Sequence, residues 1–133
     1  MTLLANRLPA EDTPRPVRIL IVDDHLLYAE ALSLLLREQD LEVVGIAGDG
    51  RQALAVAAEL RPDLVLMDIE MPLMDGITAT RRIRERLPET RVVVMTALTG
   101  DEHAEQALGA GAVACIRKFC AASDLLYAIE GAV

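Results

Sequence analysis

Five times along the chain, a short aliphatic run is followed by a longer segment with helical periodicity. No other feature of the sequence constrains the fold as strongly. The connections between successive segments are only a few residues long. Five strand-then-helix units are typical of an α/β fold with a parallel sheet, and not of a sandwich, a barrel or a bundle. We therefore predict a doubly wound, five-stranded parallel sheet. The expected strands are 17–22, 41–46, 64–67, 92–95 and 112–116, and the expected helices are 26–37, 51–60, 77–86, 101–108 and 123–131.

The composition fits one domain with an aliphatic core. Of 133 residues, 53% are hydrophobic but only 2% are aromatic, as suits a parallel sheet covered by helices. Thirteen basic against 21 acidic residues give a formal charge of -8, which opposes direct binding to nucleic acid or to an anionic membrane surface. No apolar run approaches the roughly 20 residues of a spanning helix, and the N-terminus lacks a signal-peptide pattern. We expect a cytoplasmic protein without membrane contact.

Residues 1–16 differ from the rest of the chain. They carry Pro9, Pro14 and Pro16 among mixed charges and show no sustained periodicity, which is typical of a mobile terminal segment. We expect a mobile leader over 1–16 and one domain over 17–133.

The two cysteines and the two histidines give no metal-ligand pattern. Cys115 and Cys120 form a C-x4-C pair without further Cys or His at ligand spacing, so we interpret them as reduced, structural thiols. His25 and His103 stand apart from each other, and we assign neither a role.

Three carboxylates follow the expected strands where those strands end. Asp23 and Asp24 come after the first strand, and Asp68 after the third. Since the carboxyl ends of parallel strands share one edge of the sheet, these side chains should converge there. Each alone could simply cap a helix. Together they would repel unless protonated or neutralised by a cation, and their hard oxygens favour magnesium or manganese.

The fourth and fifth strands bring groups suited to an anion. Thr96 ends the fourth strand, with the small Ala97 beside it, and Lys118, which is the only lysine of the chain, follows the fifth. A hydroxyl donor and a point charge on a flexible stem can neutralise phosphoryl oxygens. The alternative interpretation of Lys118 is a chance surface lysine.

A loop rich in special residues follows the third strand. Pro72 fixes the chain direction and Gly76 permits a close backbone approach. We expect this loop to aim a backbone carbonyl, that of Glu70, at the metal. We expect Asp75 to cap the next helix and not to bind metal.

Five short segments that contain these residues form one ordered pattern, and the pattern is specific only when all of them are taken together. They are Val22-Asp23-Asp24-His25, Leu66-Met67-Asp68, Met71-Pro72-Leu73-Met74-Asp75-Gly76, Met95-Thr96-Ala97 and Lys118. Over residues 17–133 the pattern resembles the receiver domain of two-component response regulators. The resemblance implies a flavodoxin-like (βα)5 fold with strand order 2-1-3-4-5.

The resemblance also implies that a sensor histidine kinase, or a small phosphodonor, transfers a phosphoryl group to this domain with Mg2+ or Mn2+. The residues implied are Asp68 for phosphorylation, Asp23, Asp24, Asp68 and the Glu70 carbonyl for the metal, and Thr96, Ala97 and Lys118 for catalysis and switching. Beyond its own phosphorylation and dephosphorylation, such a domain is not expected to be an enzyme.

The opening Asp-Asp-His and the run after Met71 are most similar to the NarL/FixJ (LuxR-type) subfamily. Its members usually carry a C-terminal helix-turn-helix domain, through which alone we expect DNA contact. Two alternatives stay open: a receiver from a longer transcription regulator, or a stand-alone regulator that acts through protein contacts. A phosphorylation-dependent homodimer is a further expectation.

The sequence departs from the family pattern at two positions, and three rival functions stay open. Cys115 stands where the family often has an aromatic, and Phe119 where it commonly has Pro or Asp, so we expect the usual switch to be altered. A phosphatase remains a rival because Asp68-Ile69-Glu70 superficially matches a D-x-D motif, although this motif follows the third strand and not the first. A flavin binder would need a Ser-, Thr- and Gly-rich loop after strand one, and a degenerate receiver should lack part of the acidic set.

Overall fold

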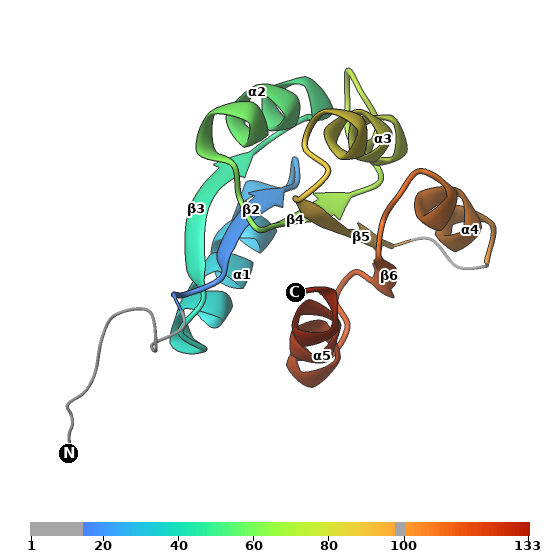
Figure 1. The fold of residues 1–133 in the computed structure, drawn as a ribbon. Coiled ribbons are helices and arrows are strands. Elements are labelled where there is room, and N and C mark those ends of the chain that lie inside the picture. Colours follow the sequence, from blue (N-terminus) through green and yellow to red (C-terminus); the bar gives the residue numbers. More distant parts are fainter. Residues whose placement is uncertain (1–14, 98–100) are drawn as a thin grey trace, which may run out of the picture.

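The computed structural model describes residues 15–97 and 101–133. Most of the expected leader, 1–14, therefore lies outside the described residues. Within the described part, five strands alternate with five helices along the chain (Figure 1). The strands are β2 (Arg18–Val22), β3 (Glu42–Ala47), β4 (Leu64–Asp68), β5 (Arg91–Thr96) and β6 (Ala114–Arg117), and the helices are α1 (Leu26–Glu38), α2 (Gly50–Leu60), α3 (Gly76–Arg86), α4 (Glu102–Gly109) and α5 (Ala122–Ala132).

The five strands form one parallel sheet in the order β3-β2-β4-β5-β6. Numbered along the chain, this order is 2-1-3-4-5, which confirms the predicted fold class. The order reverses between β2 and β4, and their adjacent C-terminal ends form the place where doubly wound folds bind ligands.

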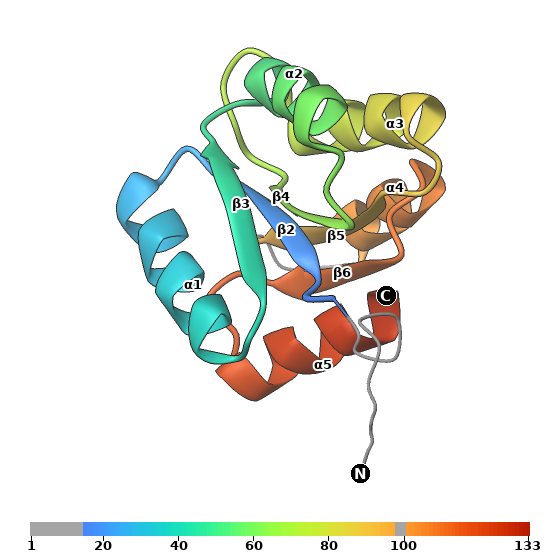
Figure 2. The same cartoon turned by 60° about the vertical axis from the view of Figure 1, so that its left-hand side comes forward.

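Helices cover both faces of the sheet, α1 and α5 on one face and α2, α3 and α4 on the other (Figures 1 and 2). The central strand β2 shows why two layers are needed. Leu20 and Val22 pack toward α2 and α3, whereas Ile19 and Ile21 pack toward α1 and α5, and all four are fully buried. Each such aliphatic side chain contributes about 1.5–3 kcal/mol when it leaves water, so the central strands are firmly anchored.

Acidic side chains fix where two of the helices begin. Asp49 accepts a hydrogen bond from the backbone N–H of Gln52 at the start of α2 (2.8 Å), and Asp75 accepts two at the start of α3. Such caps satisfy backbone donors that have no partner inside the helix. Asp75 is thereby confirmed as the predicted helix cap.

No helix in the described ranges combines the length and the apolar character that a membrane crossing requires. Cys115 and Cys120 are both free, as predicted.

Candidate functional site

Four of the predicted side chains lie at one edge of the sheet because the strands run in register. Val22 pairs with Met67, so Asp23 and Asp68 follow on adjacent strands. Thr96 ends β5 and pairs with Arg117, which places Lys118 immediately beyond the edge. The backbone N–H of Lys118 donates to the Thr96 carbonyl (2.8 Å) and extends this pairing by one residue.

The carboxylates at this edge are buried to different degrees. Asp23 and Asp68 are only 1% and 2% exposed, whereas Asp24 is exposed. Burial, and then the charge of Asp23, raise the pKa of Asp68, although Lys118 and the Glu70 backbone N–H act in the opposite direction. An ionised Asp68 is therefore costly without a further cation.

Lys118 is the cation that the carboxylates already share. Its Nζ lies 2.8 Å from Asp23 Oδ2 and donates to Asp68 Oδ2 at 3.3 Å. Burial alone would lower the pKa of Lys118, but the contacts with Asp23 and Asp68 together outweigh burial and raise it. Lys118 is thus held as an ammonium between two buried carboxylates, and the interpretation as a chance surface lysine is wrong.

His25 also lies in this cluster, although the sequence analysis gave it no role. Its backbone N–H donates to Asp23 Oδ1 (2.8 Å), and its Nδ1 lies 3.2 Å from that oxygen, 3.3 Å from Asp24 Oδ1 and 3.0 Å from Lys118 Nζ. The position of His25 directly after the acidic pair was a signal that could have placed it at the sheet edge. Its contact with Lys118, 93 residues away, could not be read from the sequence.

The donor atoms fit a hard divalent cation. One ligand atom each of Asp23, Asp24, His25 and Asp68 lie within 4.8 Å of one another. Donor atoms this close together could be shared by one ion. Asp23 Oδ2 is buried, and the Lys118 ammonium lies 2.8 Å from it. The carboxylate oxygens suit magnesium better than the imidazole does.

The loop after β4 approaches Asp68 closely. The Glu70 backbone N–H donates to Asp68 Oδ1 (3.3 Å), and the Gly76 N–H donates to the Ile69 carbonyl (2.9 Å). A Cβ on Gly76 would collide with the Asp68 carbonyl and with Ile69 Cα. A glycine is therefore required at this position for the loop to close over β4. Metal binding by the Glu70 carbonyl stays a prediction.

The two predicted residues at the end of β5 differ in exposure. Thr96 is buried, whereas Ala97 is exposed, and the predicted role of Ala97 in phosphate access stays a prediction. Cys115 pairs with Val94 in the sheet and packs, half-buried, on the core beneath α2, α3 and α4. Burial raises the pKa of its thiol, as expected for a structural cysteine.

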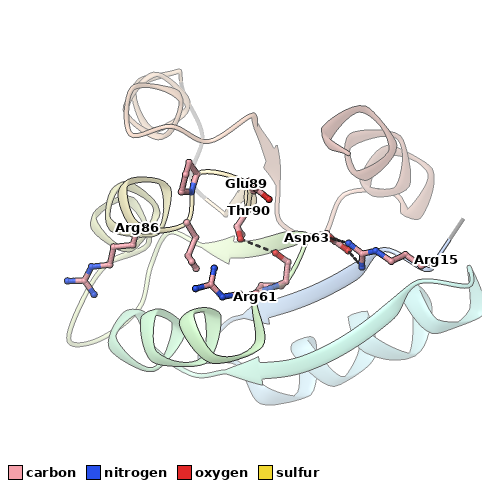
Figure 3. A pocket seen from close by; sticks show the side chains of 9 residues that line it. Arg15, Arg61, Asp63, Arg86, Glu89 and Thr90 are labelled. Carbon is pink, nitrogen blue, oxygen red and sulfur yellow. Dashed lines mark hydrogen bonds and ion pairs between the residues drawn. The ribbon is translucent and has the colours of Figure 1, made fainter. Parts of the chain in front are cut away.

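A hollow of about 280 Å³ lies at the opposite edge of the sheet, where β4 and β5 begin (Figure 3). Asp63 accepts hydrogen bonds from the Arg15 guanidinium (2.8 Å) and from the Arg18 backbone N–H (2.9 Å). The Thr90 hydroxyl donates to the Pro62 carbonyl (2.9 Å). These contacts hold together the chain segments that precede the strands. We therefore interpret this edge of the sheet as structural.

A comparison with protein families matches residues 19–130 to the response regulator receiver domain. The chain belongs to this family. It is thus a receiver domain of a two-component response regulator, and its fold and acidic edge agree with the resemblance stated from the sequence.

Individual relatives support this assignment. The response regulator VraR of Staphylococcus aureus is 40% identical to this receiver domain over 115 residues, which cover 86% of the chain and 55% of VraR. The chain thus spans about half the length of the curated relatives it matches.

Solved structures match over nearly the whole receiver domain. A CheX–CheY complex with BeF3 and magnesium from Borrelia burgdorferi has a TM-score of 0.86 at 29% identity, over 91% of this chain and 92% of that one. The receiver domain of the response regulator NarL from Mycobacterium tuberculosis has a TM-score of 0.83 at 33% identity, over 89% and 96%.

Proposed function

We propose that Asp68 of this receiver domain accepts a phosphoryl group from a sensor histidine kinase. The observation that carries the proposal is the buried Asp68 carboxylate at the end of β4, paired with Lys118 and adjacent to Asp23. A carboxylate oxygen of Asp68 attacks phosphorus, the phosphorus–nitrogen bond of the kinase phosphohistidine breaks, and its electron pair stays on the imidazole. The product is an aspartyl phosphate on Asp68.

The metal belongs to the same proposal. Asp23, Asp24, Asp68 and the Glu70 carbonyl would hold Mg2+, with Mn2+ as an alternative. The ion supplies positive charge that offsets the phosphoryl oxygens during transfer. His25 lies against Asp23 and Asp24 and would orient these carboxylates from the solvent side.

Lys118 and Thr96 would bind the transferred oxygens, and Ala97 would leave room for them to enter. The Lys118 ammonium already contacts Asp23 and Asp68. It is therefore close to the position that the phosphoryl oxygens would take once Asp68 is phosphorylated. Phosphoryl transfer depends mainly on alignment and charge neutralisation, and this is what the three side chains offer. None of them needs to supply a proton.

The output is proposed from the relatives. VraR and the NarL and LuxR-family neighbours favour control of transcription, with DNA contacted through an output domain and the receiver forming a phosphorylation-dependent homodimer. A stand-alone regulator that acts through protein contacts is the alternative. We place the domain at 17–133 and the protein in the cytoplasm, where its free thiols would stay reduced.

Intact mass tests the proposal directly. The chain is incubated with acetyl phosphate or phosphoramidate, with magnesium and with a chelator in its place. We expect one added phosphoryl group only with magnesium, and none in Asp68→Asn. Uptake at an undiminished rate in that variant would overturn the assignment of Asp68, and turnover of external phosphate esters would revive the phosphatase alternative.

A further inference from the structure

Two aromatic side chains, Tyr28 and Phe119, lie near the Lys118 ammonium and contact each other. The Tyr28 ring, from α1, has its centroid 4.9 Å from Lys118 Nζ, and the Phe119 ring lies 5.8 Å away. The two rings contact each other edge to face, with centroids 4.8 Å apart. An ammonium is attracted to aromatic faces at these distances. The Lys118 ammonium thus contacts two carboxylates and also lies near two aromatic rings.

The hydroxyl of Tyr28 also fixes the backbone that carries Lys118. The Phe119 backbone N–H donates to Tyr28 Oη at 3.3 Å. Phe119 has a φ of 65°, a conformation that is unfavourable for a bulky residue and needs support from its surroundings. Tyr28 supplies that support from another element of the fold.

Core packing does not account for the position of Phe119. The Phe119 side chain is 71% exposed, so burial does not hold it in place. An apolar hollow of about 220 Å³, lined by both aromatic residues, lies between α1 and α5. Tyr28 is half-buried and packs against the core on this face of the sheet, and its contacts with Lys118 and Phe119 join that packing to the ammonium.

We propose that Tyr28 is a positioning residue for the phosphoryl-binding lysine, with Phe119 as its partner. The inference rests on the proposed function of Lys118. The Tyr28 ring limits where the ammonium can lie, and its hydroxyl holds the turn that presents the ammonium to Asp68. Removing the ring leaves the charge but lets Lys118 adopt unproductive positions.

The test compares Tyr28→Leu and Tyr28→Phe with the matched control Leu27→Ala, since Leu27 is the exposed neighbour of Tyr28 on α1. We expect Tyr28→Leu to slow magnesium-dependent phosphorylation by acetyl phosphate about three- to tenfold, with unchanged magnesium affinity in calorimetry. Tyr28→Phe keeps the ring and should lose less. Leu27→Ala should match the wild type.

A double-variant cycle separates positioning from a general loosening of the fold. Combined with Lys118→Met, Tyr28→Leu should cause no additional loss of rate, because no ammonium remains to be positioned. An equal loss in both backgrounds, or a wild-type rate in Tyr28→Leu, would overturn the inference. If the wild type takes up no phosphoryl group, the proposed function fails instead.

The chain offers a spectroscopic readout for the same contact. It has no tryptophan and two tyrosines, and Tyr127 is 80% exposed. In a Tyr127→Phe background Tyr28 is the sole tyrosine. We expect Lys118→Met to change its fluorescence and absorbance, and identical spectra with and without the Lys118 ammonium would contradict the ring contact.

Discussion

Asp68 combines two unfavourable conditions, since its carboxylate is buried and Asp23 lies beside it. Burial and the charge of Asp23 raise its pKa above the ordinary value of 3.8. Compared with the unfolded chain, the folded state therefore favours the protonated form of Asp68. The stability that protonated Asp68 contributes is fully present below pH 3.8 and is lost as the pH rises through the folded-state pKa. At neutral pH without metal, Asp68 lowers the free energy of unfolding.

The variant Asp68→Asn should therefore lose phosphorylation and gain stability. We expect its free energy of unfolding in the absence of magnesium to rise by on the order of 1 kcal/mol at pH 7, because the repulsion with Asp23 is removed. Urea unfolding at pH 7 and near pH 4 measures the effect, which should shrink at the lower pH. A variant less stable than the wild type at pH 7 would show that Lys118 already offsets the charge of Asp68.

Substitutions of Asp75 and Asp24 should have opposite effects on the free energy of unfolding and on magnesium affinity. Burial alone would raise the pKa of Asp75, but hydrogen bonds from Thr78 and Ile77 outweigh it and lower the pKa. Its contribution to stability is present above pH 3.8 and is lost as the pH falls through its folded-state pKa. Asp75→Ala should cost about 1 kcal/mol of stability with magnesium affinity intact. Asp24→Ala should do the reverse, and equal loss of metal affinity in both would contradict the assignment.

At the residue scale, the sequence predicted the side chains that follow strands but not their lateral contacts. Asp23, Asp68 and Lys118 could be found because parallel strands end at one edge. The position of His25 after the acidic pair could have placed it at the sheet edge, but not in contact with Lys118. Tyr28 could not be given a role, because helical periodicity predicts a buried face and not which distant ammonium a side chain on that face contacts. Phe119 was noticed only as a departure from the family pattern.

At the scale of elements, the loop between β4 and α3 connects the phosphorylation site to a helix start. Gly76 lies at the first position of α3 with no space for a Cβ beside the Asp68 backbone. The same residue donates to the Ile69 carbonyl. The direction of α3 and the position of Asp68 are therefore set by one close backbone approach.

Gly76→Ala should consequently damage both the fold and the site. We expect a loss of about 2–3 kcal/mol in the free energy of unfolding, because the new methyl group forces the backbone apart, together with slower phosphorylation of Asp68. Gly131→Ala in α5 is the matched control, since a Cβ there meets nothing within 4 Å, and it should gain up to about 1 kcal/mol from helix propensity. Equal effects of the two substitutions on phosphorylation would refute the geometric argument.

Element bounds were predictable to within about two residues because strand and helix signals are local. The expected strand 112–116 shows the limit, since β6 begins at Ala114. Gly111 adopts a φ of 109°, and the Ala112 backbone N–H donates back to the Ala107 carbonyl (3.0 Å). Ala112 thus belongs to the turn after α4, although it is apolar and buried like a strand residue.

At the scale of the whole molecule, burial is uneven across the sheet. β4, in the centre, is buried along its whole length, whereas β6, at the edge, has no fully buried residue. In α4 only Ala107 is buried. Few buried contacts mean a low free energy of local opening, so the side formed by α4 and β6 is where a charge added at Asp68 can shift the structure most easily.

Hydrogen exchange should therefore change most over residues 97–105 when a phosphoryl mimic is bound; of these, 98–100 lie outside the described residues. Thr96 and Lys118, which hold the ends of β5 and β6 together, would move toward the added oxygens. Cys115 is half-buried and too small to act as the aromatic switch seen in the family, so a displacement of this segment would carry the signal. The Lys118→Ala variant should still bind the metal, but its hydrogen exchange should no longer differ between the free protein and the protein with the phosphoryl mimic bound. A change confined to the loop 70–76, with 97–105 unaltered, would place the signal at the phosphorylation loop instead.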